Sequence, residues 1–235
     1  MVTACVVALV GAVVVSSAQA GEVGRAVVRA IRGNAQYADA GQWLPLKEGQ
    51  TLKPGSTIRT ANESQVDLFM DQNGPMVRLM ENTTLGIDKL NSEATGIETI
   101  IETQLDLKSG RVLGIVRKMA SDSKYEVKTP NGVAGVRGTE TQYDISATSV
   151  VREVSGSLVV VYVKSDGTVV TQVVNTGEMF VPSEAAVKPI PPDELGQLVA
   201  LFNDLRGAPT AVLRVEEPVQ IFVSPTSGRD TSIKQ

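Results

Sequence analysis

The residues of this chain that could do chemistry are one arginine in a glycine-rich run and a scatter of carboxylates. The run is Gly132-Val133-Ala134-Gly135-Val136-Arg137-Gly138-Thr139. It superficially suggests a phosphate loop, but it lacks the P-loop lysine, the dinucleotide-binding glycine spacing and a helical pattern behind it. A guanidinium between Val136 and Gly138 is costly to bury without carboxylate or carbonyl partners. We therefore expect Arg137 to clamp its own loop, with contact to a ligand or partner as the alternative.

The other residue types favour neither a catalytic site nor a metal site. The chain has no histidine, which removes Ser-His and Cys-His nucleophile systems and histidine metal ligands. Cys5 is the single cysteine, so no disulfide can form within the chain. Asp71 and Asn73 are spaced like the start of a calcium loop, but no later ligands follow, and Asn73-Gly74 favours a hairpin turn. No catalytic residue, metal or cofactor is predicted, and a glycosidase pair cannot be named among the scattered carboxylates.

Composition limits the class of partner. The chain has 235 residues, of which 42% are hydrophobic and 20% charged, as in an ordinary soluble globular protein of one or two domains. The net charge of -4 argues against a phosphate-binding face, and the aromatic content of 4% argues against base-stacking surfaces. We therefore expect proteins or glycans as partners, and no nucleic acid.

Short alternating segments predict an all-β fold. Val66, Leu68 and Met70, for example, share one face of a predicted strand. The predicted strands cover residues 25–31, 57–60, 64–70, 76–80, 85–88, 97–107, 112–116, 125–129, 139–145, 158–163 and 169–174. Many short strands favour a sandwich or roll, and the closely spaced turns leave a partly β-helix-like body as the alternative. Residues 41–46 are expected to form a loop that carries Trp43, a core or rim residue, with partner binding as the minority interpretation.

The two ends of the chain carry different signals. Residues 1–20 are uncharged, read apolar from Val2 to Val15 and end in Ala18-Gln19-Ala20, which predicts a signal peptide without its usual basic start. Residues 21–185 are then the β domain, with no membrane-spanning segment in the mature chain. Residues 186–235 are expected to be a linker, one helix over 193–205 and a disordered tail. The helix has an apolar stripe that should pack on the β domain, formed by Leu195, Leu198, Val199, Phe202 and Leu205.

The glycine-rich run belongs to a longer pattern, residues 125–140, which we call the signature segment. It resembles the core signature of the FecR domain family: aromatic-x-V-x-T-P, then A-x-V-R-G-T, then a strand with an aromatic residue. The matching residues are Tyr125, Val127, Thr129-Pro130, Gly135-Val136-Arg137-Gly138-Thr139 and Tyr143. Flanking patterns of the family match at residues 49–60, 66–74, 107–112 and 154–160, so the resemblance extends over residues 23–182.

The resemblance implies an extracytoplasmic bacterial module. In the named members of the family this domain belongs to a membrane-anchored regulator that senses a receptor and controls a sigma factor. We expect the chain to be an exported, periplasmic or secreted module alone, without the cytoplasmic region of those regulators. We expect a non-enzymatic binding or scaffolding role toward an envelope protein or a cell-surface polymer. The alternatives are a secreted carbohydrate- or peptidoglycan-binding protein and, of a different class, a hydrolase that uses carboxylates.

Overall fold

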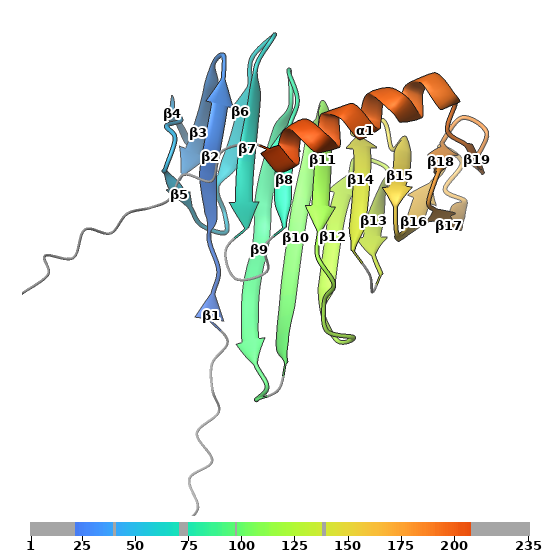
Figure 1. Ribbon diagram of the computed structural model, residues 1–235, viewed down its shortest axis with the longest axis horizontal. Helices are drawn as coiled ribbons and strands as arrows, with labels where there is room; N and C mark the ends of the chain where they lie inside the picture. The colour runs from blue at the N-terminus through green and yellow to red at the C-terminus, as the bar shows by residue number, and fades with distance from the viewer. Residues whose placement is uncertain (1–21, 40, 71–74, 97, 138–139, 208–235) are drawn as a thin grey trace, which may run out of the picture.

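The computed structural model describes residues 22–39, 41–70, 75–96, 98–137 and 140–207. Within these residues the chain forms two β-sheets that face each other and one helix, α1 (Pro192–Gly207), that crosses the outside of one sheet (Figure 1). The signal peptide and the tail predicted for the two ends lie outside the described residues, as do Asp71 to Gly74 of the predicted turn.

The first sheet, sheet A, holds the signature segment. Its hydrogen-bonded order is β17 (Val169–Asn175), β16 (Ser157–Val163), β13 (Gly132–Val136), β12 (Lys124–Thr129), β10 (Thr99–Ser109), β9 (Thr84–Ala94), β6 (Thr57–Thr60), β3 (Ala35–Asp39) and β4 (Gln42–Pro45), and the short β1 (Glu22–Val23) pairs with the far end of β9. Both β9 and β10 are 11 residues long and extend past the rest of the sheet (Figure 1).

The second sheet, sheet B, runs alongside sheet A. Its order is β19 (Ala186–Pro189), β18 (Glu178–Val181), β15 (Val151–Ser155), β14 (Thr141–Ser146), β11 (Arg111–Val116), β8 (Met76–Leu79), β7 (Gln65–Met70), β2 (Ala26–Arg32) and β5 (Thr51–Leu52). In both sheets the strands follow one another nearly in sequence order, because the chain crosses from sheet to sheet as it advances along the sandwich (Figure 1).

The predicted all-β sandwich is confirmed, and the β-helix alternative applies to one turn of the chain. Neighbouring strands pair antiparallel, with the exception of β10 and β12, which pair parallel to each other. Between these two strands the chain forms β11 in the opposite sheet and then returns to lie beside β10. This path is the same as one coil of a β-helix. It lies immediately before the signature segment and fixes where that segment enters sheet A.

The core lies between the two sheets and follows the alternation of each strand. Val66, Leu68 and Met70, predicted to share a face, are all fully buried. Each such side chain contributes about 1.5–3 kcal/mol when it is removed from water. Facing them from sheet A are side chains such as Ile58, Leu85, Leu105 and Val127. The face of sheet A away from this core is called the outer face below.

Helix α1 covers the outer side of sheet B. Leu198, Phe202 and Leu205 are buried there in a second apolar cluster that includes Leu113 and Ile115 of β11. The predicted apolar stripe is thus confirmed at Leu198, Phe202 and Leu205, and Leu195 packs partly buried against the same cluster. Val199 is 41% exposed and does not belong to the contact. Within the described residues, no helix is long and apolar enough to cross a membrane.

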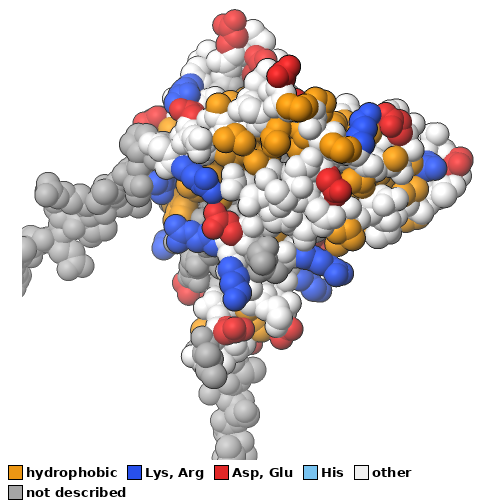
Figure 2. Space-filling view, turned by 45° about the vertical axis from the view of Figure 1, so that its right-hand side comes forward, with side chains coloured by type: hydrophobic (Ala, Val, Ile, Leu, Met, Phe, Trp, Pro, Cys, Tyr) orange, Lys and Arg blue, Asp and Glu red, His pale blue; other side chains and the backbone are white. Residues whose placement is uncertain are grey.

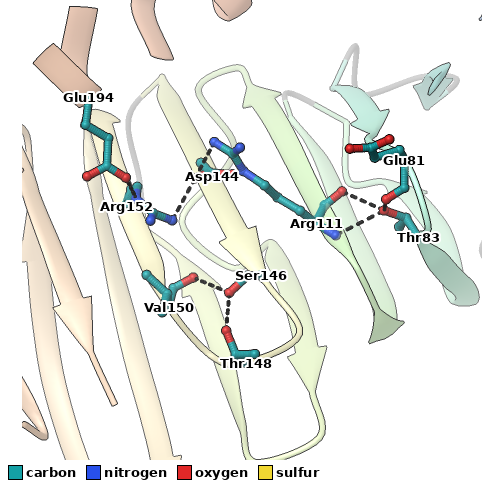
Figure 3. A network of polar contacts seen from close by, with 9 residues as sticks. All are labelled: Glu81, Thr83, Arg111, Asp144, Ser146, Thr148, Val150, Arg152 and Glu194. Atoms are coloured by element: carbon teal, nitrogen blue, oxygen red, sulfur yellow. Dashed lines mark hydrogen bonds and ion pairs between the residues drawn. The ribbon is translucent and has the colours of Figure 1, made fainter. Parts of the chain in front are cut away.

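Charged side chains fasten the first turn of α1 to sheet B (Figure 3). Glu194 makes an ion pair of 2.5 Å with Nε of Arg152, and Arg152 reaches Asp144 at 3.1 Å. Asp144 is fully buried and also accepts from Nε of Arg111 at 2.5 Å. The chain of contacts therefore joins α1 to β15, β14 and β11.

The last turn of α1 is fastened through a buried arginine. Arg78 of β8 is fully buried, and its Nε and Nη2 donate to the two carboxylate oxygens of Asp67 at 2.6 and 2.7 Å. Its Nη1 donates to Asp204 of the helix at 2.6 Å. A buried arginine is tolerated only when its donors are satisfied, so Asp67 and Asp204 are both required for this packing.

Two expectations about irregular segments are wrong. Residues 42–45 form strand β4, because they pair in register with β3, from Gln36 opposite Pro45 to Asp39 opposite Gln42. Part of the expected linker is strand β19, which pairs with β18 and extends sheet B. The β domain therefore continues past residue 185 and is closed by α1.

Candidate functional site

The signature segment folds as the β12–β13 hairpin of sheet A. Thr129 pairs with Gly132, so Pro130 and Asn131 form the turn, where the missing N–H of proline costs no ladder bond. Gly132 is required by close packing, because a Cβ on it would lie 2.3 Å from the carbonyl oxygen of Val161. The hairpin is extended by β16, which places Gly135 beside Val159 and Val133 beside Val161.

A hollow of about 610 Å³ lies over this hairpin, and we call it the signature groove. It is bordered by the β11–β12 connection and by the outer face of β12, β13 and β16, and its lining includes Met119, Lys124, Gly135, Arg137, Val159 and Val161. A Cβ on Gly135 would meet only the carbonyl oxygen of Val159, at 3.9 Å. This glycine therefore keeps the floor of the groove low without being needed for packing.

The signature groove combines an apolar floor with charges at its sides. Val133, Val159 and Val161 contribute the floor from two neighbouring strands. Lys124 and Glu126 project from β12, and Ser121 lies on the β11–β12 connection. Such a surface suits an extended segment with small apolar side chains and at least one charged group.

Arg137 lies at the end of this groove and is exposed. Its backbone N–H donates to the carbonyl oxygen of Ser157 at 3.4 Å, which continues the pairing of β13 with β16. Among the described residues, its guanidinium makes neither a hydrogen bond nor an ion pair. Gly138 and Thr139 of its own loop lie outside the described residues, so the expected clamp stays a prediction.

Two other residues of the signature point into the protein. Val136 is 8% exposed and belongs to the core between the sheets. The hydroxyl of Thr129 lies 2.8 Å from that of Ser149, which joins the β12–β13 turn to the β14–β15 connection. These positions hold the hairpin in place, whereas Gly135 and Arg137 face the groove.

Trp43 lies far from the signature groove. It is on β4, the end strand of sheet A, and five strands separate β4 from β13. The guanidinium of Arg59 stacks 4.0 Å from the centre of the Trp43 ring and also donates to Gln36. One face of the indole is therefore occupied by the protein itself, and the structure does not bring Trp43 and Arg137 together.

Sequence reasoning missed a set of polar groups that lie buried near the signature. The hydroxyls of Tyr125 and Tyr143 are 2.7 Å apart in the core, where burial raises the pKa of both phenols. Glu153 is fully buried, and burial raises the pKa of its carboxyl to about 9. The nearby backbone groups of Gln142 and Ser155 lower this pKa, but by less than burial raises it. Neither oxygen of the Glu153 carboxyl has a well-formed hydrogen bond within the described residues. Glu153 is therefore protonated at neutral pH.

No part of the signature groove offers a metal site among the described residues, since they contain no group of three or more His, Cys, Asp or Glu side chains that could hold an ion. The hydroxyl of Ser123, at the rim, accepts from the backbone N–H of Ile101 and is committed to the fold. The groups that the groove offers to a ligand are the cations of Arg137 and Lys124 and the valines of its floor.

Comparison with family models gives a match to the FecR protein family over residues 56–174. The match covers more than half of the chain. The chain belongs to the FecR family. The matched range begins at β6 and ends within β17, so it contains the signature hairpin and the whole signature groove. No curated protein matches the chain, and no solved structure matches it either.

Membership of the FecR family indicates a general role and a general location. The family is regulatory and signalling-related, and its domains are typically periplasmic or envelope-associated. Strands β2 to β5 and the segment from β18 to α1 lie outside the FecR match, yet they are integral to both sheets.

Proposed function

We propose that this FecR chain is a non-enzymatic extracytoplasmic binding module that captures an envelope protein or polymer at the signature groove. The observation that supports it most is Arg137, an exposed guanidinium with no partner among the described residues, beside an apolar floor. Helix α1 occupies the outer side of sheet B, which leaves the outer face of sheet A for a partner.

The chemistry of the groove suggests what part of a partner enters it. A carboxylate can bind a guanidinium through two parallel hydrogen bonds, which gives orientation as well as energy. Val159 and Val161 offer apolar contact next to that position. The occupant we infer is an extended segment that carries a carboxylate close to an apolar group, and such a segment occurs in proteins and in peptide-bearing wall polymers alike.

The proposal of binding without turnover follows from the residue types at hand. The chain contains no histidine, so the serine hydroxyls near the groove have no imidazole base. Glu153, whose carboxyl pKa is raised to about 9 by burial, is fully buried on the core side of sheet B. A partner in the signature groove would not touch it.

The test is capture from the native envelope fraction with the purified chain as bait. Arg137→Ala should lower capture by at least tenfold, because a few anchor side chains carry most of the binding energy of an interface and Arg137 is the proposed anchor. Arg137→Lys should restore part of it, since an ammonium keeps the charge but not the bidentate geometry. Lys89→Ala is the matched control: it removes one exposed cation from β9 of the same sheet and should leave capture unchanged.

Two further measurements separate the alternatives. Co-sedimentation with purified peptidoglycan, lost in Arg137→Ala, would move the proposal to a polymer partner. Formation of a product from the captured partner, abolished by changing one carboxylate while the fold persists, would overturn the non-enzymatic role.

The extracytoplasmic location has its own test. Cleavage after Ala20 should give a mature chain that begins at Gly21 in the envelope or the medium, as measured by intact mass. Recovery of the chain from the cytoplasm with Met1 retained would contradict export.

A further inference from the structure

The four end strands of the two sheets are not equally protected. An open sheet edge pairs readily with another strand, and proteins block such edges with short strands, proline or charge. In sheet B, β5 is two residues long and β19 contains Lys188 and Pro189; in sheet A, β4 ends in Pro45. Strand β17, the other end of sheet A, has none of these devices.

Strand β17 is long, regular and uncharged. Its seven residues, Val169 to Asn175, pair with β16 without a register shift and contain neither proline nor a charged side chain. Val169 is 60% exposed and Val173 is 51% exposed. The apolar surface continues onto β16 through Val161 and Val163, and apolar side chains reach the surface between scattered charges at the end of the molecule turned forward in Figure 2.

The backbone of β17 presents free hydrogen-bonding groups on its open side. The hairpin to β16 is closed by the N–H of Lys164 donating to the carbonyl of Thr168, so every second residue from Thr168 points its backbone groups toward β16. The backbone N–H and C=O groups of Val169, Thr171 and Val173 therefore point toward the open edge. Within the described residues, no group forms a hydrogen bond with them. At Asn175 the outward N–H is taken by the side chain of Glu178 at 2.8 Å, which ends the free edge.

We propose that β17 pairs antiparallel with β17 of a second copy of this chain, about a two-fold axis at Thr171. In this register Thr171 lies opposite Thr171 of the second copy, and Val169 lies opposite its Val173. Moving the two-fold axis by one residue shifts the register by two, and it would bring the already satisfied Asn175 or the turn residue Gly167 into the pairing. The Thr171 register is therefore the one that uses all three outward residues.

The second copy is favoured as the occupant because the edge is complementary to itself. Every outward pair in the proposed register joins two β-branched side chains, which pack well across strands. No like charges meet, since the strand has none.

The pairing would join the two outer faces of sheet A into one surface. Each signature groove shares strand β16 with this surface, so the two grooves would open on the same side of the dimer. A short strand pair buries less than the roughly 1,200–2,000 Å² of a standard stable interface. We therefore expect a weak dimer that forms with rising concentration.

The experiment is sedimentation of the purified full-length chain over a range of concentrations, under reducing conditions because Cys5 is its single thiol. The mass should rise from that of the 24.9 kDa chain toward twice that value. Thr171→Lys places two ammonium groups opposite each other and should weaken the dimer at least tenfold. Leu44→Lys is the control: it adds the same charge to an exposed apolar position of β4, at the other end of the sheet, and should leave the dimer intact.

A charge exchange tests both the identity of the occupant and the register. Thr171→Glu alone should also stay monomeric, whereas an equimolar mixture of Thr171→Lys and Thr171→Glu should restore the dimer. A monomer at all concentrations, a dimer unaffected by Thr171→Lys, or a mixture that fails to associate overturns the proposal. So does a monomer whose Val169, Thr171 and Val173 amides are protected from hydrogen exchange, because the edge is then covered by the chain's own tail.

Discussion

Glu153 is a single side chain whose environment controls the pH response of the fold. Its carboxyl lies on the core side of β15 together with Val151, and its pKa of about 9 means that the folded protein holds a proton that the unfolded chain releases near pH 4.5. The folded state therefore binds more protons than the unfolded state between these two pH values. Stability from this group is complete below about pH 4.5 and is lost as the pH rises toward 9.

The corresponding prediction is that Glu153→Gln flattens the stability profile above pH 5. The wild-type free energy of unfolding should fall by about 1.4 kcal/mol per pH unit in this window, apart from other groups. Glutamine has nearly the same shape and no proton to lose, so the variant should exceed the wild type at pH 8. Urea unfolding at pH 5, 7 and 8.5 measures this, and equal slopes in the two proteins would show that Glu153 is charged in the folded state.

Two glycines that look alike in the sequence differ sharply in space. Gly114 of β11 lies opposite Tyr143 of β14, and a Cβ there would fall within 2.4 Å of the buried phenol ring. Gly135 faces the signature groove, with nothing nearer than 3.9 Å.

Gly114→Ala should accordingly destabilise the protein by about 1–3 kcal/mol, because the ring of Tyr143 would be displaced from a packed core. Gly135→Ala should change stability by less than about 0.5 kcal/mol and reduce partner capture by filling the groove. Thermal unfolding of the two variants gives the comparison. Similar melting temperatures for both would refute the steric role of Gly114.

At the level of elements, α1 depends on polar contacts as much as on its apolar stripe. Asp204 reaches into sheet B to pair with Arg78, and Arg78 holds the pKa of this carboxyl below its ordinary value. A lowered pKa contributes stability above the ordinary carboxyl range, and this contribution is lost as the pH falls through the folded-state value. The helix should therefore loosen in acid at its C-terminal end first.

Removing this anchor gives a direct prediction. Asp204→Ala leaves Nη1 of the buried Arg78 without its acceptor and should cost about 1–3 kcal/mol in urea unfolding. Arg206→Ala is the matched control in the same turn, since its pair with Glu140 is exposed on both sides and is expected to contribute less than about 1 kcal/mol. A loss in the control equal to that in Asp204→Ala would mean that general helix fraying, and not Arg78, sets the effect.

The elements that could be predicted from the sequence are those whose pattern is local. Strands with clean alternation, such as residues 57–60 and 112–116, are confirmed with the same or nearly the same bounds. Strand β4 was missed because Gly41 and Pro45 are typical of a loop, and its strand character comes from pairing with β3. Pairing across the sheet is a tertiary effect that a single strand's sequence does not encode.

The candidate site shows the same limit. The signature segment itself was found, and Arg137 was named with both of its interpretations. The groove was not foreseen, because Val159 and Val161 come from β16 and Met119 from the β11–β12 connection. Alternation alone places Val159 and Val161 on one face, but it does not say that this face lies beside Gly135. The buried Arg78, with partners 11 and 126 residues away, was equally beyond local reasoning.

At the scale of the whole molecule, the sandwich has no natural break at the limits of the FecR match. Residues 56–174 exclude β2, which pairs with β7, and β18, which pairs with β15. They also exclude α1, which covers Leu113 and Ile115. The part of the chain that carries the family pattern is therefore smaller than the unit that is closed by packing.

A fragment of residues 56–174 should consequently fail to fold cooperatively. It would expose the backbone edges of β7 and β15 and the apolar cluster beneath α1, and such edges and faces drive aggregation. A chain that ends after residue 207 is the control, since it retains every described strand and the helix with its contacts to Arg78 and Arg152. The control should keep the urea midpoint of the full chain, whereas the fragment should bind a hydrophobic dye and show no sharp transition. A fragment as stable as the control would show that the FecR match alone is the folding unit, and that β2, β18 and α1 are additions to it.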